Sequence, residues 1–361
     1  MKRAWWSPKP IAIALASAIG WATIGWMIAS GGPGPAHAED PRAIDPPRAV
    51  ETRIDRLDAA LDHILAKDAK IEKVAEGFAF LEGPVWMPGG YLLFSDIPNN
   101  VIYKWTPPGK IELFRSDAGY SGADIGEYKE PGSNGLTVDR QGRLTINELG
   151  NRRGTRIEAN GKVTVMAERY QGKRLSSPND LVYRSDGTLF FTDPPFGMPG
   201  YHDDPRMELS FSGVFRVGDR RLHLLTRDLP GPNGLAFSPD EKHLYVANWN
   251  PNLRVLMRYD VSAEGDLSAG RVFFDFADAP EKDQAPDGMK VDTEGNVYVA
   301  APGGVWIISP QGRHLGTLRG PELPANMAWG ESDGKTLYMT ARHGLYRIRL
   351  NVPGPLPAGK G

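Results

Sequence analysis

The chain has 361 residues, of which 40% are hydrophobic, and its formal net charge is −2. This length and composition suffice for one large core or two ordinary ones, and the near-zero charge gives no reason to expect nucleic acid or an anionic membrane as a partner. The chain contains no cysteine, which excludes disulfides, thiolate catalysis and thiolate metal sites and leaves oxygen and imidazole groups as possible metal ligands.

Residues 1–38 have the pattern of a signal peptide. Three basic residues within the first nine precede an apolar run from residue 11 to about residue 29, and Ala36-His37-Ala38 matches a cleavage site. We therefore expect a periplasmic or secreted protein that is not held at the membrane once the signal is cleaved. The alternative is an uncleaved membrane anchor, because the apolar run approaches the length that spans a bilayer.

The segment 39–70 is expected to be a linker followed by a short helix. Residues 39–50 are rich in proline and charge, which is typical of linkers. Between Asp55 and Ala69 the apolar residues recur at helical spacing, which predicts a short amphipathic helix that packs on the rest of the chain or acts as a lid. These apolar residues are Leu57, Leu61, Ile64 and Leu65.

Residues 71–350 contain six copies of one pattern, which consists of a polar start, an apolar strand, a polar turn and a second β-rich strand. We name the first residue of each copy its lead residue. The lead residues are Glu82, Asn134, Asn179, Asn233, Asp287 and Asn326, at intervals of 39 to 54 residues. Repeats of this length, with about four short strands each, are typical of propeller blades. We predict an all-β fold, a six-bladed β-propeller with four-stranded blades, and a C-terminal tail over residues 351–361.

The last blade lacks its fourth strand in sequence order. The chain after Leu350 contains Pro353 and Pro355, which are incompatible with a central strand. An unpaired strand, residues 71–75, precedes the first copy of the pattern. We expect this strand to complete the last blade and close the ring.

The lead residues predict a central metal site. In a propeller the innermost strand of each blade lines the central channel, so residues at one repeat position converge on the axis. All six lead residues carry a side-chain oxygen and two are carboxylates, which suits one hard divalent cation, above all Ca²⁺. The alternative is that Asn-Gly and Asp-Gly are turn dipeptides kept for backbone reasons. Glu82 and Asn326 lie outside such dipeptides and still carry oxygen, which favours the metal.

Five motifs follow one another along this region. They are Glu82-Gly83-Pro84-Val85-Trp86, Ser177-Pro178-Asn179-Asp180-Leu181, Phe191-Thr192-Asp193-Pro194-Pro195-Phe196-Gly197, Pro232-Asn233-Gly234-Leu235 and Ala285-Pro286-Asp287-Gly288-Met289. Over about residues 55–350 the chain resembles the family of gluconolactonase, senescence marker protein and luciferin-regenerating enzyme. The resemblance implies a calcium-dependent propeller that hydrolyses lactones.

The resemblance also assigns roles to residues. It implies that Glu82, Asn179, Asn233 and Asp287 bind the metal, that Asp287 is the catalytic acid/base, and that Asn134 and Asn326 lie in the outer substrate pocket. Glu148 and Arg174 are further candidates for substrate binding. Glu148 has a repeat position near the channel mouth, and Arg174 is the nearest arginine to Ser177, where animal members of the family place an arginine two residues before Asn179. A histidine common in bacterial members is replaced in the stretch 147–153, so the identity of the lactone stays open.

The favoured function is that of a hydrolase, a lactonase acting on sugar-type lactones such as gluconolactone. Calcium would polarise the lactone carbonyl and a carboxylate would activate water. The alternatives are a promiscuous esterase or organophosphate hydrolase with the same metal cage, or a non-enzymatic binding propeller with a structural cation. The expected partner is the small-molecule substrate, and no partner protein is evident. The insertion 194–209, which contains His202, is a candidate loop over the channel.

Overall fold

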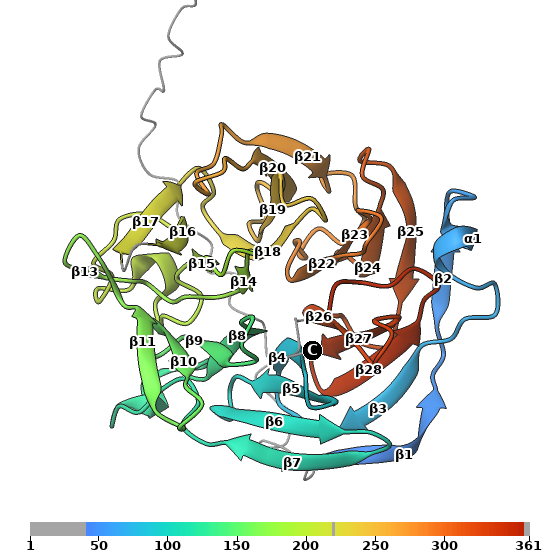
Figure 1. Ribbon diagram of the computed structural model, residues 1–361, viewed down its shortest axis with the longest axis horizontal. Helices are drawn as coiled ribbons and strands as arrows, with labels where there is room; N and C mark the ends of the chain where they lie inside the picture. The colour runs from blue at the N-terminus through green and yellow to red at the C-terminus, as the bar shows by residue number, and fades with distance from the viewer. Residues whose placement is uncertain (1–40, 219–220, 357–361) are drawn as a thin grey trace, which may run out of the picture. The chain divides into compact units, whose positions relative to one another are not determined.

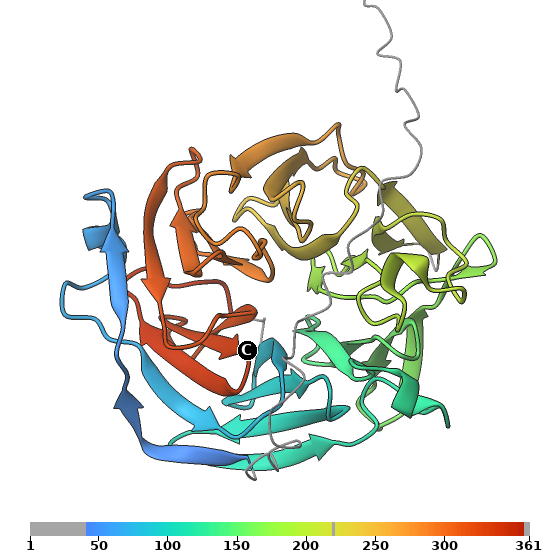
Figure 2. The ribbon, with the colours of Figure 1, turned by 180° about the vertical axis from the view of Figure 1, so that it is seen from behind.

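The computed structural model of the protein describes residues 41–218 and 221–356 (Figure 1). The predicted signal peptide, residues 1–38, lies outside this part of the chain. Within it, short antiparallel strands form six sheets that are arranged around a centre as the blades of a propeller, and this arrangement is also clear from behind (Figure 2). The prediction of an all-β, six-bladed propeller built on four-stranded blades is confirmed, and two of the blades carry a fifth strand at the outer edge.

The first four blades each use four consecutive strands. Blade 1 consists of β4 (Leu81–Met87), β5 (Tyr91–Asp96), β6 (Val101–Thr106) and β7 (Lys110–Arg115), and blade 2 of β8 (Ser133–Val138), β9 (Leu144–Glu148), β10 (Arg153–Ile157) and β11 (Val163–Ala167). Blade 3 consists of β14 (Leu181–Tyr183), β15 (Leu189–Asp193), β16 (Gly213–Gly218) and β17 (Arg221–Thr226), and blade 4 of β18 (Pro232–Phe237), β19 (His243–Asn248), β20 (Val255–Asp260) and β21 (Arg271–Asp275). A small hairpin, β12 (Arg169–Tyr170) and β13 (Lys173–Arg174), joins blades 2 and 3.

The last two blades each recruit strands from the start of the described chain. Blade 5 consists of β22 (Met289–Val291), β23 (Val297–Ala301), β24 (Gly304–Ile308), β25 (His314–Arg319) and, on its outer edge, β2 (Arg53–Arg56). Blade 6 consists of β26 (Asn326–Gly330), β27 (Thr336–Ala341), β28 (Gly344–Arg349), β3 (Glu72–Glu76) and β1 (Arg42–Ala49). Both blades therefore have five strands in place of four.

The ring closes through β3, as the sequence predicted. This strand pairs antiparallel with β28, with Ala75 opposite Leu345 and Glu72 opposite Arg347. The guanidinium of Arg347 donates from Nε to Glu72 Oε2 at 2.8 Å, so side chains reinforce the backbone pairing. Because the first strand of the ring closes its last blade, no edge strand is left unpaired at this junction.

The segment predicted to be a linker contains strand β1. It pairs with β3 on the outer rim of blade 6, beside β7 (Figure 1), and the register shifts between Ala43 and Arg48. Pro46 and Pro47 lie within this shift, and an edge strand tolerates proline because it needs hydrogen bonds on one side only. Local composition indicated a linker, but the unpaired edge of β3 imposes a strand.

The predicted amphipathic helix is reduced to one short helix, α1 (Leu61–Ile64). Its buried residues Leu61 and Ile64 join the core beneath blades 5 and 6. Leu57, expected on the apolar face, is 60% exposed, because the preceding residues form β2 along β25 and not a helical turn. No helix of the described residues is long and apolar enough to cross a membrane.

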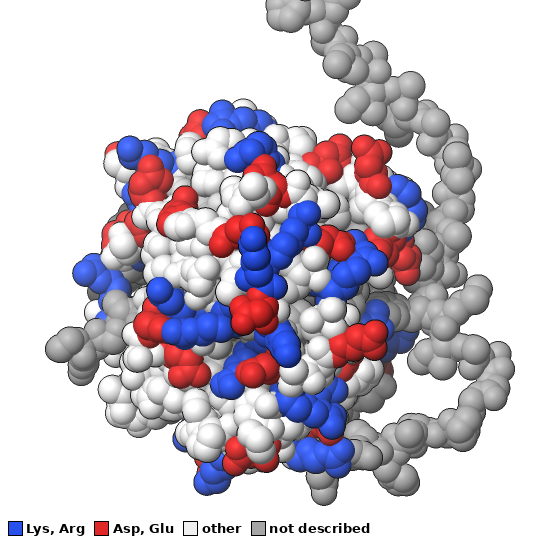
Figure 3. Space-filling view, turned by 90° about the vertical axis from the view of Figure 1, so that its right-hand side faces the viewer, with Lys and Arg blue, Asp and Glu red and all other residues white. Residues whose placement is uncertain are grey.

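The outer surface near β2 is held by charged side chains. Arg319 on β25 donates from Nε to Asp55 Oδ2 at 2.6 Å, and Arg313 pairs with Asp58 at 2.6 Å. Figure 3, which faces the side of the propeller where these elements lie, shows basic and acidic side chains interspersed. Such mixed surfaces present no large field of one sign.

The core lies between neighbouring blades, where aromatic rings fill the space. Trp86 of blade 1 stacks on Tyr338 of blade 6 with ring centroids 5.6 Å apart, and the fully buried Trp105 contacts the same tyrosine ring at 5.4 Å. Aromatic pairs of this kind add about 1 kcal/mol each beyond the area they bury. The packing between the first and last blades therefore complements the strand pairing that closes the ring.

Candidate functional site

The lead residues lie where the inner strands begin, and glycines let neighbouring blades approach one another there. A Cβ atom on Gly83 would lie 1.9 Å from the backbone oxygen of Asn134, and one on Gly288 would lie 2.2 Å from Cγ of Asn326. Gly83 also has a left-handed φ of +49°, which favours glycine. These glycines therefore serve the contact between blades, which differs from the turn role that we considered as the alternative.

Side chains on the second strands fix the lead residues further. Ser95 Oγ donates to the backbone oxygen of Asn134 at 2.8 Å, and Thr192 Oγ1 donates to that of Asn233 at 2.8 Å. In each case the donor belongs to the blade before the one that it holds. These bonds fix the starts of the inner strands of blades 2 and 4.

Asn326 is the hub of the polar cluster at the centre. Its Nδ2 donates to Glu82 Oε2 at 3.1 Å and to Asp180 Oδ2 at 3.4 Å. Its Oδ1 accepts from the backbone N–H of Met327 at 2.8 Å and faces Lys290 Nζ at 3.5 Å. Since the amide of Met327 can only donate, the orientation of the Asn326 carboxamide is fixed. Groups from blades 1, 3, 5 and 6 therefore meet around one side chain.

The carboxylates of this cluster have pKa values above their usual range. Burial raises the pKa of Glu82 to about 7, and the charge of Asp180 adds to the effect. Burial also raises the pKa of Asp180. The pKa of Asp287 is raised well above its usual value by burial and then by the charges of Glu82, Asp180 and Glu130, while a hydrogen bond from Asn233 acts in the opposite direction. Buried carboxylates that repel one another in this way favour a bound cation.

The donor set fits a hard cation. Glu82 and Asp287 supply carboxylates, Asn179 and Asn233 supply carboxamides, and all four residues lie at the starts of inner strands. In addition, Asn134 Oδ1 is buried and has no hydrogen-bond partner among the described residues. Within residues 41–218 and 221–356, no group of three or more His, Cys, Asp or Glu side chains is arranged to hold a metal. A cation at this position would therefore depend on carboxamide oxygens as well, which calcium accepts.

The predicted substrate residues have different surroundings. Asn134 is buried at the start of β8, and Asn326 belongs to the cluster itself rather than to an outer pocket. The carboxylate of Glu148 accepts from Asn151, Arg153 and Thr155 at 2.7 to 2.8 Å, so its oxygens are engaged by blade 2. Arg174 on β13 donates from Nη2 to the backbone oxygen of Asn151 at 2.8 Å. The described contacts of Glu148 and Arg174 thus lie outside the axial cluster.

Three residues of the site were missed from the sequence. Asp180 directly follows a lead residue, and Lys290 comes three residues after another, so a search along whole inner strands would have found both. Glu130 lies in the loop before β8, and burial raises its pKa to about 7. Its charge acts on Asp287 and on Tyr201, so Glu130 lies within electrostatic range of both side chains. No sequence pattern singles out Glu130.

The insertion 194–209 contacts the loop before β8, which contains Glu130. The insertion 194–209 contains a short 3-10 helix, η2 (Tyr201–Asp203), and the loop before β8 contains another, η1 (Ile125–Glu127). Arg206 pairs with Glu127 at 3.2 Å and lies over the ring of Tyr128 at 5.1 Å. Burial lowers the pKa of His202 in the same insertion. The insertion thus has a fixed partner in the loop from blade 1 to blade 2.

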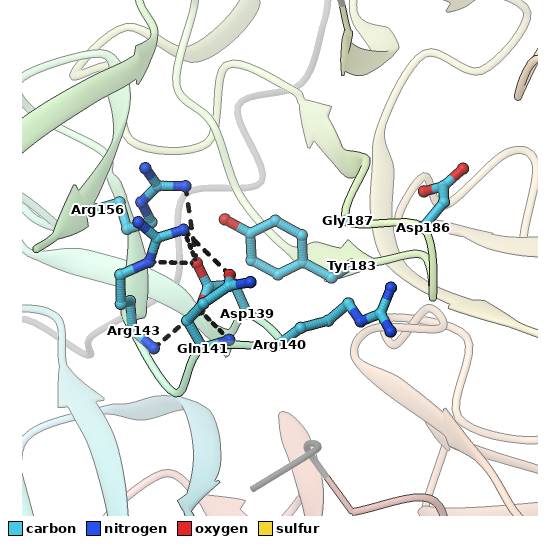
Figure 4. Close-up of a pocket in the computed structure, with 8 residues that line it drawn as sticks. All are labelled: Asp139, Arg140, Gln141, Arg143, Arg156, Tyr183, Asp186 and Gly187. Carbon is cyan, nitrogen blue, oxygen red and sulfur yellow. Dashed lines mark hydrogen bonds and ion pairs between the residues drawn. The ribbon is translucent and has the colours of Figure 1, made fainter. Parts of the chain in front are cut away.

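A separate polar pocket lies at the opposite ends of the strands (Figure 4). It has a volume of about 490 Å³ and is formed by the turns that follow β8 and β14. Asp139 lies between Arg143, at 2.6 Å, and Arg156, at 3.6 Å, and Tyr183 borders them. Because these side chains lie at the far ends of the strands from the lead residues, this pocket is distinct from the axial cluster.

The fold and the axial oxygen cluster define a six-bladed propeller with a candidate cation site at its centre. The family model described as the SMP-30/gluconolactonase/LRE-like region matches residues 80–343, and the chain belongs to this family. A gluconolactonase of Zymomonas mobilis is 37% identical over 315 residues, which cover 84% of this chain and 87% of the relative.

Two solved structures share the fold. A gluconolactonase from Xanthomonas campestris has a TM-score of 0.74 and 29% identity and covers 86% of this chain and 99% of its own. A calcium-binding regucalcin from Agrobacterium tumefaciens has a TM-score of 0.61 and 19% identity and covers 78% of this chain and 93% of its own. The second likeness supports the fold alone.

Proposed function

We propose that this protein is a carboxylic-ester hydrolase that opens sugar-type lactones such as gluconolactone, with a divalent cation, Ca²⁺, as its cofactor. The observation that carries the proposal is the meeting of Glu82, Asp180 and Asp287 around the propeller axis, where burial raises the pKa of all three and the charges of neighbouring carboxylates add to the effect on Glu82 and Asp287. Membership of the gluconolactonase family and the 37% identity to the Zymomonas mobilis enzyme point to lactones as the substrate class.

Four residues would hold the cation, namely Glu82, Asn179, Asn233 and Asp287. When bound, calcium supplies Lewis-acid chemistry that polarises the carbonyl of the lactone. Asn134 would serve the substrate, because its Oδ1 is free of other hydrogen bonds among the described residues. Asn326 would hold Glu82 in place, since its Nδ2 donates to that carboxylate.

Asp287 is the proposed acid/base. It keeps part of its surface exposed, so water can reach it, and a carboxylate beside a divalent cation stays ionised at neutral pH and can accept a proton. In the forward reaction Asp287 takes a proton from the water whose oxygen bonds to the carbonyl carbon. The ring C–O bond then breaks, and Asp287 returns the proton to the departing alkoxide. The product is the open hydroxy acid, which ionises and releases one proton to solution.

A substrate panel tests this proposal by proton release. Aldonolactones, aromatic lactones and homoserine lactones are assayed with and without a chelator, beside carboxylic esters and phosphotriesters. Turnover of aldonolactones that stops with the chelator supports the proposal. Turnover of esters or phosphotriesters alone would assign the promiscuous hydrolase, and bound metal without any turnover would assign the binding propeller.

We also propose that the chain is exported and cleaved after Ala38. The support is the order of basic, apolar and small residues in the first 38 positions. Mass spectrometry of the protein recovered from the periplasm or medium should give an N-terminus at Glu39. A full-length chain in the membrane fraction would instead assign an uncleaved anchor.

A further inference from the structure

Lys290 brings a positive charge into the axial cluster. It lies on the inner strand β22, three residues beyond Asp287. Its ammonium donates to the backbone oxygen of Met289 at 2.9 Å and reaches Asn326 Oδ1 at 3.5 Å. The same carboxamide donates from its other end to Glu82 and Asp180. One planar side chain therefore separates the ammonium from two buried carboxylates.

The charges of the cluster can be counted. Glu82, Asp180 and Asp287 contribute three negative charges when ionised, and Lys290 contributes one positive charge, which leaves a net charge of −2. Glu130 is left out of this count, because it lies in the loop before β8 and its charge acts on Asp287 more weakly than the charge of Glu82 or Asp180 does. A net charge of −2 in a buried site is balanced by one divalent cation.

We propose that Lys290 is a built-in counter-ion that limits the axial site to a single divalent cation and sets its preference for divalent over trivalent ions. This inference rests on the proposed function, because it concerns the same cation site. Lys290 is a positioning residue in this role, since it acts on the cation through Asn326 and the carboxylates and not by contact with the substrate. Without the ammonium, the same site would carry three negative charges and would favour an ion of higher charge or a second ion.

The test compares the intact mature protein with three variants. Lys290→Met removes the charge and keeps a similar length, and Lys290→Arg keeps the charge. The double variant Asp180→Asn with Lys290→Met removes one charge of each sign, so the net charge of −2 is retained. Calorimetric titration gives the number and affinity of bound Ca²⁺ ions, and Tb³⁺ is titrated in parallel as the trivalent probe. Melting temperatures in chelator report on the cation-free protein.

The wild type and Lys290→Arg should bind one calcium ion with affinities within about threefold of each other. Lys290→Met should bind calcium at least tenfold more tightly or take up a second ion, and its preference for Tb³⁺ over Ca²⁺ should rise at least tenfold, because one unit charge at this range in a partly buried site has effects of about that size. In chelator, Lys290→Met should melt several degrees lower than the wild type, and the double variant should recover most of the loss.

Wild-type affinity and wild-type ion preference in Lys290→Met would overturn the inference while leaving the proposed function intact. A wild type that binds no divalent ion would contradict the calcium site of the proposed function, and the melting temperatures in chelator would then decide whether Lys290 is a counter-ion. If Lys290→Met does not fold, the double variant decides. A charge-balanced double variant that also fails to fold or to bind one calcium ion would overturn the inference.

Discussion

Asn326 donates a hydrogen bond to Glu82 across 244 positions of sequence and so joins the last blade to the first at the axis of the propeller. The same Nδ2 also faces Asp180 at 3.4 Å. An amide donor is essential at this place, because the two neighbours are acceptors and are buried. The first prediction follows from this contact.

Asn326→Asp should destabilise the cation-free protein by about 3 kcal/mol. The change adds a fourth carboxylate to the buried cluster and places it directly against Glu82 and Asp180. Urea denaturation in chelator measures the free energy of unfolding, and added calcium should recover part of the loss. Asn252→Asp makes the same change at an exposed position and should have little effect. Equal stability of Asn326→Asp and the wild type in chelator would mean that the cluster is not formed as described.

The two carboxylates proposed as metal ligands should respond differently to neutralisation. Asp287→Asn keeps an oxygen for the ion and removes the base, so calcium affinity should be largely retained while turnover falls by about a hundredfold or more. Glu82→Gln should weaken calcium binding and show partial rescue at high calcium. Calorimetry and steady-state kinetics separate the two effects. Near-wild-type turnover in Asp287→Asn with normal calcium binding would move the base to another group.

Closure of the ring by β3 can be tested by truncation. A chain that starts at residue 78 lacks β1, β2, α1 and β3 and leaves β28 unpaired, so its melting temperature should fall steeply or the protein should aggregate through the exposed edge. A chain that starts at residue 51 lacks β1 alone and should lose much less. Similar melting temperatures of the wild type and the chain from residue 78 would contradict the closure.

Asp193 gives a pH-dependent contribution to stability. Burial raises the pKa of this carboxyl group to about 7, although its oxygens accept from the backbone N–H groups of Ser176 and Ser177 at 2.8 and 2.7 Å. Because the folded pKa exceeds the unfolded one, the contribution is fully present below pH 4 and is lost as the pH rises through about 7. The unfolding free energy of the wild type relative to Asp193→Asn should therefore fall between pH 5 and 8.

Asp204→Asn is the control for this measurement. The guanidinium of Arg206 holds the pKa of Asp204 below its usual range, so its contribution is present above the unfolded pKa and is lost only at lower pH. Between pH 5 and 8 the difference between the wild type and Asp204→Asn should stay constant. A flat difference for Asp193→Asn as well would show that Asp193 is ionised throughout this range.

The sequence predicted the ring well because its signal is local and repeated. Each blade shows strands of alternating pattern with polar turns, and the closing strand was expected from the prolines after Leu350. Strands β1 and β2 were not predicted because their form depends on partners far away in the chain. In the pairing of β2 with β25, for example, Arg53 lies opposite Arg319. Only the finished blades offer these edges.

The candidate site was predicted in part for a related reason. The lead residues share one repeat position, so Glu82 and Asp287 could be placed at the axis by symmetry. Asp180 and Lys290 break that symmetry, because a charged side chain at the repeat position of each occurs in one blade only. Their part in the cluster is visible only in the folded ring, where Asn326 contacts both of them. The hydrogen bonds that Glu148 accepts from Arg153 and Thr155 likewise could not be predicted from the spacing of residues in the sequence.

The central claim is that an axial calcium ion supports lactone hydrolysis, and one titration tests it most directly. Purified mature protein is stripped with a chelator, and proton release from gluconolactone, corrected for spontaneous hydrolysis, is followed as calcium is returned. The account predicts no activity above the spontaneous rate in the stripped protein and full activity at one calcium ion per chain. Undiminished activity in the stripped protein, with no metal left by elemental analysis, would contradict it.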